Sequence, residues 1–351
     1  MADRTDPDQV EVVGIGSAIV DVLAHASDEE VAALGLAKGS MTLVDQPESD
    51  RLLAAMGPAT QASGGSAANT MVGVSCLGRS AAYLARVADD ELGQVFSRDI
   101  RAAGVHFAAR SVGGGPPLDG EGTGRCLVLV TPDAERTMST YLGVASQLGS
   151  ADVDTDLVAQ AKILYVEGYL WDMPAAKQAL RAAMAAARRA GGRVALSLSD
   201  SFCVQRHRDD FLTLVADEVD VVFANQAEVS LLTGTQDVGA AIDQVAEGPA
   251  LWAVTLGSQG SVVAAGSERV KVPAWPVEPV VDTTGAGDLY AAGFLFGLTH
   301  SDPGVGESWA AGDLERCARL GSLVAGEVIG HLGARPGPGL REMAEQVGLL
   351  S

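Results

Sequence analysis

Apolar, β-rich runs alternate regularly with helical stretches over the second half of the chain. The β-rich runs lie at 163–167, 194–199, 219–224 and 252–256, and the helical stretches lie at 174–190, 204–216 and 225–246. Parallel strands need long crossover connections, which are usually helices, and these helices then cover both faces of the sheet. The alternation therefore predicts an α/β fold, namely a doubly wound, mostly parallel sheet with helices on both faces.

Two segments of the first half, 18–46 and 122–142, do not keep this alternation. Their short β-rich runs fit a separate small β-sheet better than the main sheet. Ligands of doubly wound sheets bind beyond the carboxyl ends of the strands, where a small sheet would act as a lid. The other residues are predicted to form one large α/β domain, which comprises 1–17, 47–121 and 143–351.

Glycine and proline divide the first half of the chain into shorter elements. Residues 10–22 form one apolar run, which predicts a single strand with a bulge or a close backbone approach at its glycines. Residues 66–77 predict a helix that begins behind two glycines, with Ser66 as its N-cap. The stretch 113–122 is rich in glycine and proline and predicts a loop, to which no motif assigns a role.

The composition excludes several kinds of partner. The 351 residues include 24 basic and 45 acidic side chains, a net charge of −21, whereas nucleic acids and anionic membranes need clustered Lys and Arg. No apolar stretch is long enough to span a membrane, and residues 1–11 have no signal-peptide core. The four cysteines are widely spaced, without a disulfide or zinc pattern. We therefore expect a reduced, cytoplasmic protein, a monomer or homodimer without nucleic-acid or membrane partners.

The segment 282–288, with the sequence DTTGAGD, carries the strongest chemical signal. A glycine-rich loop that opens a helix presents free backbone N–H groups at the positive end of the helix dipole, which suits a phosphoryl group. Asp288 would lie in the first helical turn, where its carboxylate could accept a proton from an attacking hydroxyl. Phosphoryl transfer to an alcohol requires this combination. From the residues alone, the alternative is an ordinary helix start with a dipole-favoured aspartate.

These residues resemble the C-terminal signature of the PfkB/ribokinase family of carbohydrate and nucleoside kinases. The similarity covers 281–295, and the other family landmarks follow in order within residues 10–335. They are a first strand ending at Asp21, the N-terminal signature 64–78, the NQAE motif 225–228 and the strand and turn 254–260. The resemblance implies a ribokinase-like fold and an ATP-dependent kinase that moves the γ-phosphoryl group to a primary hydroxyl.

The resemblance also implies catalytic roles for individual residues. Asp288 would be the catalytic base, and the N–H groups of Gly285, Ala286 and Gly287 would form the anion hole. Arg136, on the predicted lid hairpin, would meet the transferred phosphate. Without the resemblance, a lone arginine at this position is an ordinary solvated side chain.

Three residues are assigned by the resemblance to the substrate. Asp21 and Asn69 would bind its hydroxyl groups, and Gly65 would allow close approach of the backbone. A carboxylate and an amide together offer the acceptors and donors that a diol needs. The chain contains only two asparagines, Asn69 and Asn225, and both fall in these motifs.

The implied ATP site lies in the second half of the chain. Its residues are Asn225, Glu228, Thr255, Gly257, Gly260 and Asp282. Glu228 would act on Mg²⁺ mainly through water, because that ion dehydrates reluctantly. Without the resemblance, Glu228 is an exposed helix residue and Asn225 an N-cap. The resemblance further implies a monovalent cation, K⁺, near Asp282 and Thr284.

Substrate choice in this family depends on the lid and the first strands. Tyr169 or Trp171 could stack on a purine, and Met41 and Met138 could form an apolar slot beside it. The same side chains could instead pack the lid against the core. The predicted substrate is adenosine, phosphorylated on its 5′-hydroxyl to give AMP. The alternatives are a sugar kinase for ribose, fructose or a keto-deoxy sugar, and a non-catalytic nucleoside sensor.

Overall fold

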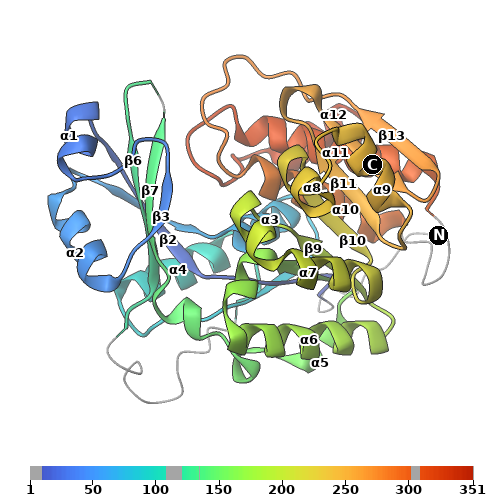
Figure 1. Ribbon diagram of the computed structural model, residues 1–351, viewed down its shortest axis with the longest axis horizontal. Helices are drawn as coiled ribbons and strands as arrows, with labels where there is room; N and C mark the ends of the chain where they lie inside the picture. Colours follow the sequence, from blue (N-terminus) through green and yellow to red (C-terminus); the bar gives the residue numbers. More distant parts are fainter. Residues whose placement is uncertain (1–9, 108–120, 134, 302–308, 351) are drawn as a thin grey trace.

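The computed structural model describes residues 10–107, 121–133, 135–301 and 309–350, and these residues form two sheets (Figure 1). The large sheet has the strand order β13-β12-β11-β10-β9-β8-β1-β5. Its strands are β1 (Val12–Ile15), β5 (Ala81–Leu84), β8 (Ile163–Glu167), β9 (Arg193–Ser197), β10 (Val221–Asn225), β11 (Leu251–Thr255), β12 (Ser261–Ala265) and β13 (Glu268–Val272). All pair in parallel except β12 and β13, which add antiparallel at one edge. The predicted α/β fold is confirmed.

Helices cover both faces of the large sheet, because successive side chains of a strand point to opposite faces. On β10, Val221 and Phe223 belong to the core of one face, and Val222 and Ala224 to that of the other. The first face packs against α3 (Ser66–Cys76), α4 (Glu91–Ala102), α10 (Ala286–Ser301), α11 (Ala311–Val328) and α12 (Leu340–Gln346). The second packs against α5 (Thr155–Gln160), α6 (Pro174–Arg189), α7 (Ser201–Asp217), α8 (Gln226–Thr233) and α9 (Val238–Ala246).

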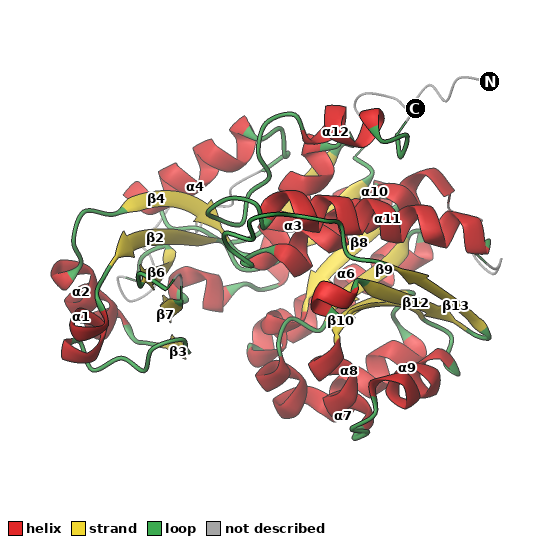
Figure 2. Ribbon diagram, turned by 90° about the horizontal axis from the view of Figure 1, so that it is seen from above, coloured by secondary structure: helices red, strands yellow, loops and turns green. Residues whose placement is uncertain are grey.

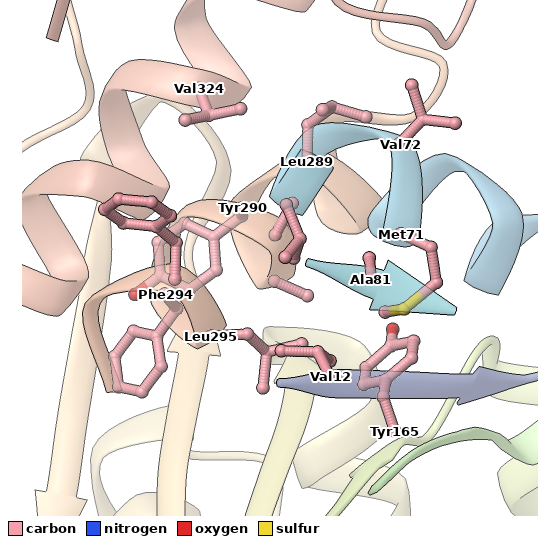
Figure 3. Packing of buried hydrophobic residues seen from close by; sticks show 14 of the residues in the cluster. Val12, Met71, Val72, Ala81, Tyr165, Leu289, Tyr290, Phe294, Leu295 and Val324 are labelled. Carbon is pink, nitrogen blue, oxygen red and sulfur yellow. The ribbon is translucent and has the colours of Figure 1, made fainter. Parts of the chain in front are cut away.

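Helix α10 lies at the centre of the first face and is buried along most of its length. Figure 3 shows Leu295 near Val12 of β1, with Tyr290 and Phe294 packed beside them. A helix that is apolar on all sides belongs in a protein interior, and here the sheet, α3 and α11 surround it. No helix among the described residues is long and apolar enough to cross a membrane. The burial of α10 fixes the position of its first turn, which holds Asp288.

The second sheet is mixed and has the strand order β3-β7-β6-β2-β4. Its strands are β2 (Ile19–His25), β3 (Met41–Leu43), β4 (Thr60–Gly64), β6 (Gly124–Val130) and β7 (Arg136–Tyr141). Helices α1 (Asp28–Ala33) and α2 (Gln46–Ala55) cover the face that is turned away from the large sheet (Figures 1 and 2). The predicted hairpin of β6 and β7 is confirmed. The opposite face carries Asp21 and Arg136 toward the large sheet.

Two local predictions need correction, and one strand was missed. The run 10–22 is not one strand but two, β1 and β2, which belong to different sheets. Ser66 is not the N-cap of α3, because Gly65 takes that position and no side chain caps the helix. The strand β4 was not predicted, since its residues lack apolar alternation, yet it pairs with β2 in the small sheet. The division into a large domain and a lid stays a prediction, and most of the predicted loop 113–122 lies outside the described residues.

The contact between α10 and α11 gives a test of the fold. A Cβ added at Gly293 would lie 2.5 Å from the carbonyl oxygen of Leu320, whereas one at Gly312 would meet nothing within 4 Å. We expect Gly293→Ala to lower the free energy of unfolding by about 1–3 kcal/mol, because two packed helices must separate. Gly312→Ala is the control and should leave stability unchanged or slightly higher. Urea unfolding of both variants measures this, and equal stabilities would contradict the packing described.

Candidate active site

A cavity of about 250 Å³ lies at the carboxyl ends of the central strands of the large sheet. The cavity is lined by residues at the ends of β9, β10 and β11 and by residues in the first turns of α3 and α10. This is where doubly wound sheets bind their ligands. The predicted residues that line it are Asn225, Glu228, Thr255, Gly285, Ala286, Gly287 and Asp288. The fold therefore brings together residues that are far apart in the sequence.

Asp288 is held by three side chains of the neighbouring helix α3. Ser66 Oγ donates to Asp288 Oδ1 at 2.7 Å, Asn69 Nδ2 donates to Oδ2 at 2.9 Å, and Thr70 Oγ1 donates to the backbone carbonyl at 3.1 Å. Removal of water raises the pKa of Asp288 to about 6, although the bonds from Asn69 and Ser66 and the charge of Arg335 oppose the rise. A carboxylate with this pKa is ionised at neutral pH and still able to take up a proton.

Asn69 was predicted to bind substrate hydroxyls, and the structure gives its amide nitrogen a different partner, Asp288. Its Oδ1 atom is buried and has no partner among the described residues. Its role toward a substrate therefore stays a prediction, while its contact with Asp288 is visible. Ser66 shares that role and was missed, although Ser66, Asn69 and Thr70 have the three- and four-residue spacing of one helix face.

The glycine-rich loop has the backbone geometry of an anion site. Gly285 has a φ of 76°, in the left-handed region that favours glycine, and α10 begins at the next residue. The N–H group of Ala286 points to the Thr283 carbonyl at 3.3 Å, whereas the described residues provide no acceptor for those of Gly285 and Gly287. Two donors at the positive end of a long buried helix are thus available to a phosphoryl group.

Arg136 reaches from β7 of the small sheet to this loop and forms an ion pair with Asp282. Both side chains are largely buried. Asp282 also accepts hydrogen bonds from the N–H groups of Thr284, at 3.0 Å, and Gly333, at 2.8 Å. The arginine was predicted to meet a phosphate and Asp282 to bind ATP. Here the two bind each other, so the small sheet is joined directly to the glycine-rich loop. Both predicted roles stay predictions.

Asn225 and Glu228 form a capping box at the start of α8. Asn225 Oδ1 accepts from the N–H groups of Ala227 and Glu228, and its own N–H and Nδ2 donate to the Glu228 carboxylate at 2.9 and 2.6 Å. The N-cap assignment is confirmed, and the alternative of an exposed Glu228 is wrong, since that side chain is buried. Burial raises the pKa of Glu228 to about 7. A divalent cation beside it would favour the ionised carboxylate.

Asp21 lies on the inner face of the small sheet, half-buried beside Gly64. A Cβ at Gly64 would lie 2.4 Å from an Asp21 carboxylate oxygen, so this glycine makes room for the side chain. Burial raises the pKa of Asp21 to about 6, while Arg335 and Arg136 oppose the rise. Among the described residues no hydrogen-bond donor is found for its carboxylate. Asp21 is therefore an acceptor available to an incoming hydroxyl.

The aromatic residues predicted near the substrate have different surroundings. Trp171 is fully buried and its indole N–H donates to Asp210, so it packs in the core. Tyr169 is half-buried, and its hydroxyl donates to the carbonyl of Ser199 at 3.5 Å. Ser199 itself has a φ of 72°, unusual for a residue other than glycine, and it lines the cavity. Tyr169 thus lies at the edge of the site, where its predicted stacking role is untested.

Three predicted glycines shape turns around the site. Gly65 has a φ of 95°, and a Cβ there would lie 2.4 Å from the Ser17 carbonyl. Gly257 and Gly260 border the short turn after β11, and a Cβ at Gly260 would lie 2.0 Å from the Val272 carbonyl. The close approach at Gly65 is to the connection between β1 and β2, which contains Ser17. The predicted contacts of these glycines with substrate or ATP stay predictions.

Two charged groups near the site, the buried Glu167 and the half-buried Arg335, were not predicted. Glu167, at the end of β8, accepts from the N–H groups of Ser17 at 2.7 Å and Ala67 at 3.0 Å, and burial raises its pKa to about 7. Arg335 follows α11 and lies between Ser63 and the first turn of α3. Glu167 could have been singled out from the sequence as an acid at the end of a predicted strand. No sequence pattern around Arg335 indicates a functional role.

An anion loop at a helix start, with a half-buried carboxylate beside it, defines an α/β phosphotransferase. Comparison with known proteins agrees, because the model of the pfkB family carbohydrate kinases matches residues 28–339. The chain belongs to this family.

Two solved structures cover 97% of this chain. An adenosine kinase from Sinorhizobium meliloti is 49% identical, with all of its own chain covered and a TM-score of 0.86. A probable sugar kinase from Rhizobium etli is 44% identical, with 99% of its chain covered and a TM-score of 0.87. An uncharacterized sugar kinase from Archaeoglobus fulgidus is 27% identical over 76% of this chain and 98% of its own. These neighbours support the ribokinase-like fold and include kinases named for both kinds of substrate.

The pKa of Asp288 gives a prediction about pH. A base must be ionised to act, so kcat/KM should fall about tenfold for each pH unit below about 6 and level off above it. ATP consumption over a pH series measures this.

The control is Asp288→Asn, which keeps the shape of the side chain but removes the base. It should lower kcat by about 100-fold or more at every pH while the unfolding midpoint stays near that of the wild type. A variant with nearly full kcat would show that Asp288 is not the base.

Proposed function

We propose that this protein is an adenosine kinase, which transfers the γ-phosphoryl group of ATP to the 5′-hydroxyl of adenosine and releases AMP and ADP. The observation that carries the proposal is the chemistry of the inner face of the small sheet. That face combines one free carboxylate with a row of apolar side chains. A nucleoside likewise combines a ribose diol with a flat, largely apolar base.

The apolar row runs across four neighbouring strands. Leu23 is paired in register with Val128, Val128 with Met138, and Met138 with Met41. Side chains at paired positions share a face, so these four lie side by side, one step along the strands from Asp21. Val128 is buried, Leu23 and Met138 are half-buried, and Met41 is exposed at the edge. Met side chains adapt to irregular surfaces and make favourable contacts with aromatic rings.

The small sheet would close over the substrate as a lid. Asp21 and Arg136 lie on the same face of the sheet as the apolar row, and Arg136 contacts Asp282 of the glycine-rich loop. A nucleoside bound there would have its base against the apolar row and its diol at Asp21. Its 5′-hydroxyl would then point toward Asp288, which acts electrostatically on Asp21.

In the reaction, Asp288 would take the proton of the 5′-hydroxyl as the oxygen forms its bond to the γ-phosphorus. The bond between that phosphorus and the bridging oxygen of ATP breaks, and ADP leaves with the electron pair. The free N–H groups of Gly285 and Gly287 would stabilise the negative charge on the transferred phosphoryl oxygens. Ser66 and Asn69 keep the carboxylate of Asp288 in place throughout.

The residues present fit a magnesium ion bound together with ATP. Among the described residues no cluster of three or more potential ligands forms a metal cage. Mg²⁺ in kinases is held chiefly by phosphate oxygens and water with one or two carboxylates, and Glu228 faces the cavity as such a carboxylate. The bound ion would neutralise charge on the phosphates. Asn225 would keep Glu228 oriented toward it.

The second candidate is a sugar kinase. The probable sugar kinase from Rhizobium etli is nearly as similar as the adenosine kinase from Sinorhizobium meliloti, at 44% against 49% identity. Asp21 alone would serve a free sugar as well as a nucleoside. The apolar row favours the nucleoside, because a sugar of similar size would leave its outward hydroxyls against apolar side chains.

A substrate panel tests the proposal. ATP consumption is measured with adenosine, inosine, cytidine, ribose and fructose, each with magnesium, and adenosine is expected to give the highest kcat/KM. A sugar with the highest value would overturn the nucleoside assignment and leave the kinase class intact. Failure of every substrate, with adenosine binding retained, would favour a nucleoside sensor.

Met138 gives a sharper test of where the base binds. Met138→Gln keeps the length of the side chain but places an amide in the apolar row, so KM for adenosine should rise about tenfold while kcat changes little. Met343→Gln, on the distant helix α12, is the matched control and should leave KM unchanged. An unchanged KM in Met138→Gln would show that the base lies elsewhere.

A further inference from the structure

The segment 332–335 follows α11, and we call it the strap. It contacts both the glycine-rich loop and the connection between β4 and α3. Gly333 donates its N–H to Asp282 at 2.8 Å. A Cβ built on Gly285 would lie 2.7 Å from the Cβ of Ala334, so the strap packs directly against the anion loop. Arg335 then reaches the turn that leads from β4 into α3. One short segment thus connects the anion loop with the turn that carries the partners of Asp288.

Arg335 donates hydrogen bonds to residues on both sides of that turn. Its Nε donates to the Ser63 carbonyl at 3.0 Å and its Nη2 to the Ser63 hydroxyl at 3.0 Å, while its Nη1 donates to the Ala68 carbonyl at 2.9 Å. Ser63 is in β4, and Ala68 is in the first turn of α3. The planar guanidinium fork therefore fixes the end of the strand relative to the start of the helix.

The charge of Arg335 acts on the two acids of the site. Its guanidinium is paired only with neutral groups in the described structure, and the acids around it are Asp21, Asp288 and Asp99. Burial lowers the pKa of Arg335 to about 10, so it remains a cation at neutral pH. It opposes the rise in pKa of both Asp21 and Asp288. The other nearby cation, Arg136, is already paired with Asp282.

We propose that Arg335 is a positioning residue for phosphoryl transfer: its fork holds the first turns of α3, with Ser66 and Asn69, against Asp288, and its positive charge favours the negative form of that carboxylate. The proposal rests on the proposed function only in taking Asp288 as the base, and it is independent of which alcohol is phosphorylated.

Other titratable groups also face Asp288, and none of those in the described structure is a cation. They are Asp21 from β2, Tyr83 from β5, Tyr165 and Glu167 from β8, Tyr169 from the turn after β8, and Glu228 from α8. Each is neutral or negative. Loss of the cation at 335 would therefore leave Asp288 among acids and tyrosines, and its proton affinity should rise.

The test compares Arg335→Gln and Arg335→Lys with the control Arg341→Gln. Arg341 is a second C-terminal arginine that also donates to a carbonyl, that of Leu77, the C-cap residue of α3 at the far end of the helix from Asp288. The titration of Asp288 is followed by carbon NMR of aspartate-labelled protein, with the spectrum of Asp288→Asn identifying its signal. This readout needs no substrate, so it remains valid even if the substrate assignment fails.

In Arg335→Gln, the Asp288 titration should move up by about one pH unit, and the acid limb of kcat/KM should move with it. In Arg335→Lys, which retains the charge without the fork, the titration should stay near that of the wild type while kcat falls several-fold. Arg341→Gln should change neither.

An Asp288 titration in Arg335→Gln equal to that in Arg341→Gln would overturn the electrostatic part of the proposal. Full kcat in Arg335→Lys would overturn the positioning part. If Arg335→Gln does not fold, the Lys variant alone decides: wild-type kcat refutes the proposal, and reduced kcat with an unmoved titration supports it.

Discussion

The hydrogen bonds from α3 to Asp288 are the contacts on which the rest of the active site depends. The donors are Ser66, Asn69 and Thr70. They fix the first turn of α10 and, with it, the glycine loop that precedes it. The start of α3 is in turn held by Glu167, which accepts from its backbone, and by Arg335, which donates to it. Asp288 is therefore positioned by two successive layers of polar contacts, which are buried or part-buried.

This arrangement has a cost in stability. Burial raises the pKa values of Asp21, Glu167, Glu228 and Asp288 to about 6 or 7, so the folded protein binds protons more tightly than the unfolded chain. Since the unfolded chain then carries fewer protons, the free energy of unfolding falls as pH rises from about 4 through these values. At neutral pH the site holds carboxylates that a protein selected for stability alone would not bury. Their concentration in one place is typical of a functional site.

The sequence predicted most features that depend on residues close together in the chain. The order of strands and helices in the second half, the hairpin that bears Arg136 and the loop with Asp288 all followed from periodicity and glycine spacing. Strand β4 and the break between β1 and β2 did not, because they depend on which sheet a segment joins and not on its own residues. Arg335 and Glu167 were missed for the same reason, since their importance lies in partners that are 100 or more residues away. Asn69 was found by its motif, but its partner Asp288 became visible only when α3 and α10 were placed side by side.

The net charge of −21 poses a physical problem for a protein that binds ATP, because the overall field repels an anionic ligand. Salt screens that field beyond about 8–10 Å, so binding depends on donors within the site. The backbone N–H groups of the glycine loop need no counter-charge. Arg136 can also contribute, because Asp282 would keep its hydrogen bonds from Thr284 and Gly333 if the arginine turned to a phosphate. The ion pair between Arg136 and Asp282 thus holds a cation near the place where the phosphates would lie. If Arg136 left Asp282 for a phosphate, the buried Asp282 carboxylate would still have two hydrogen-bond donors.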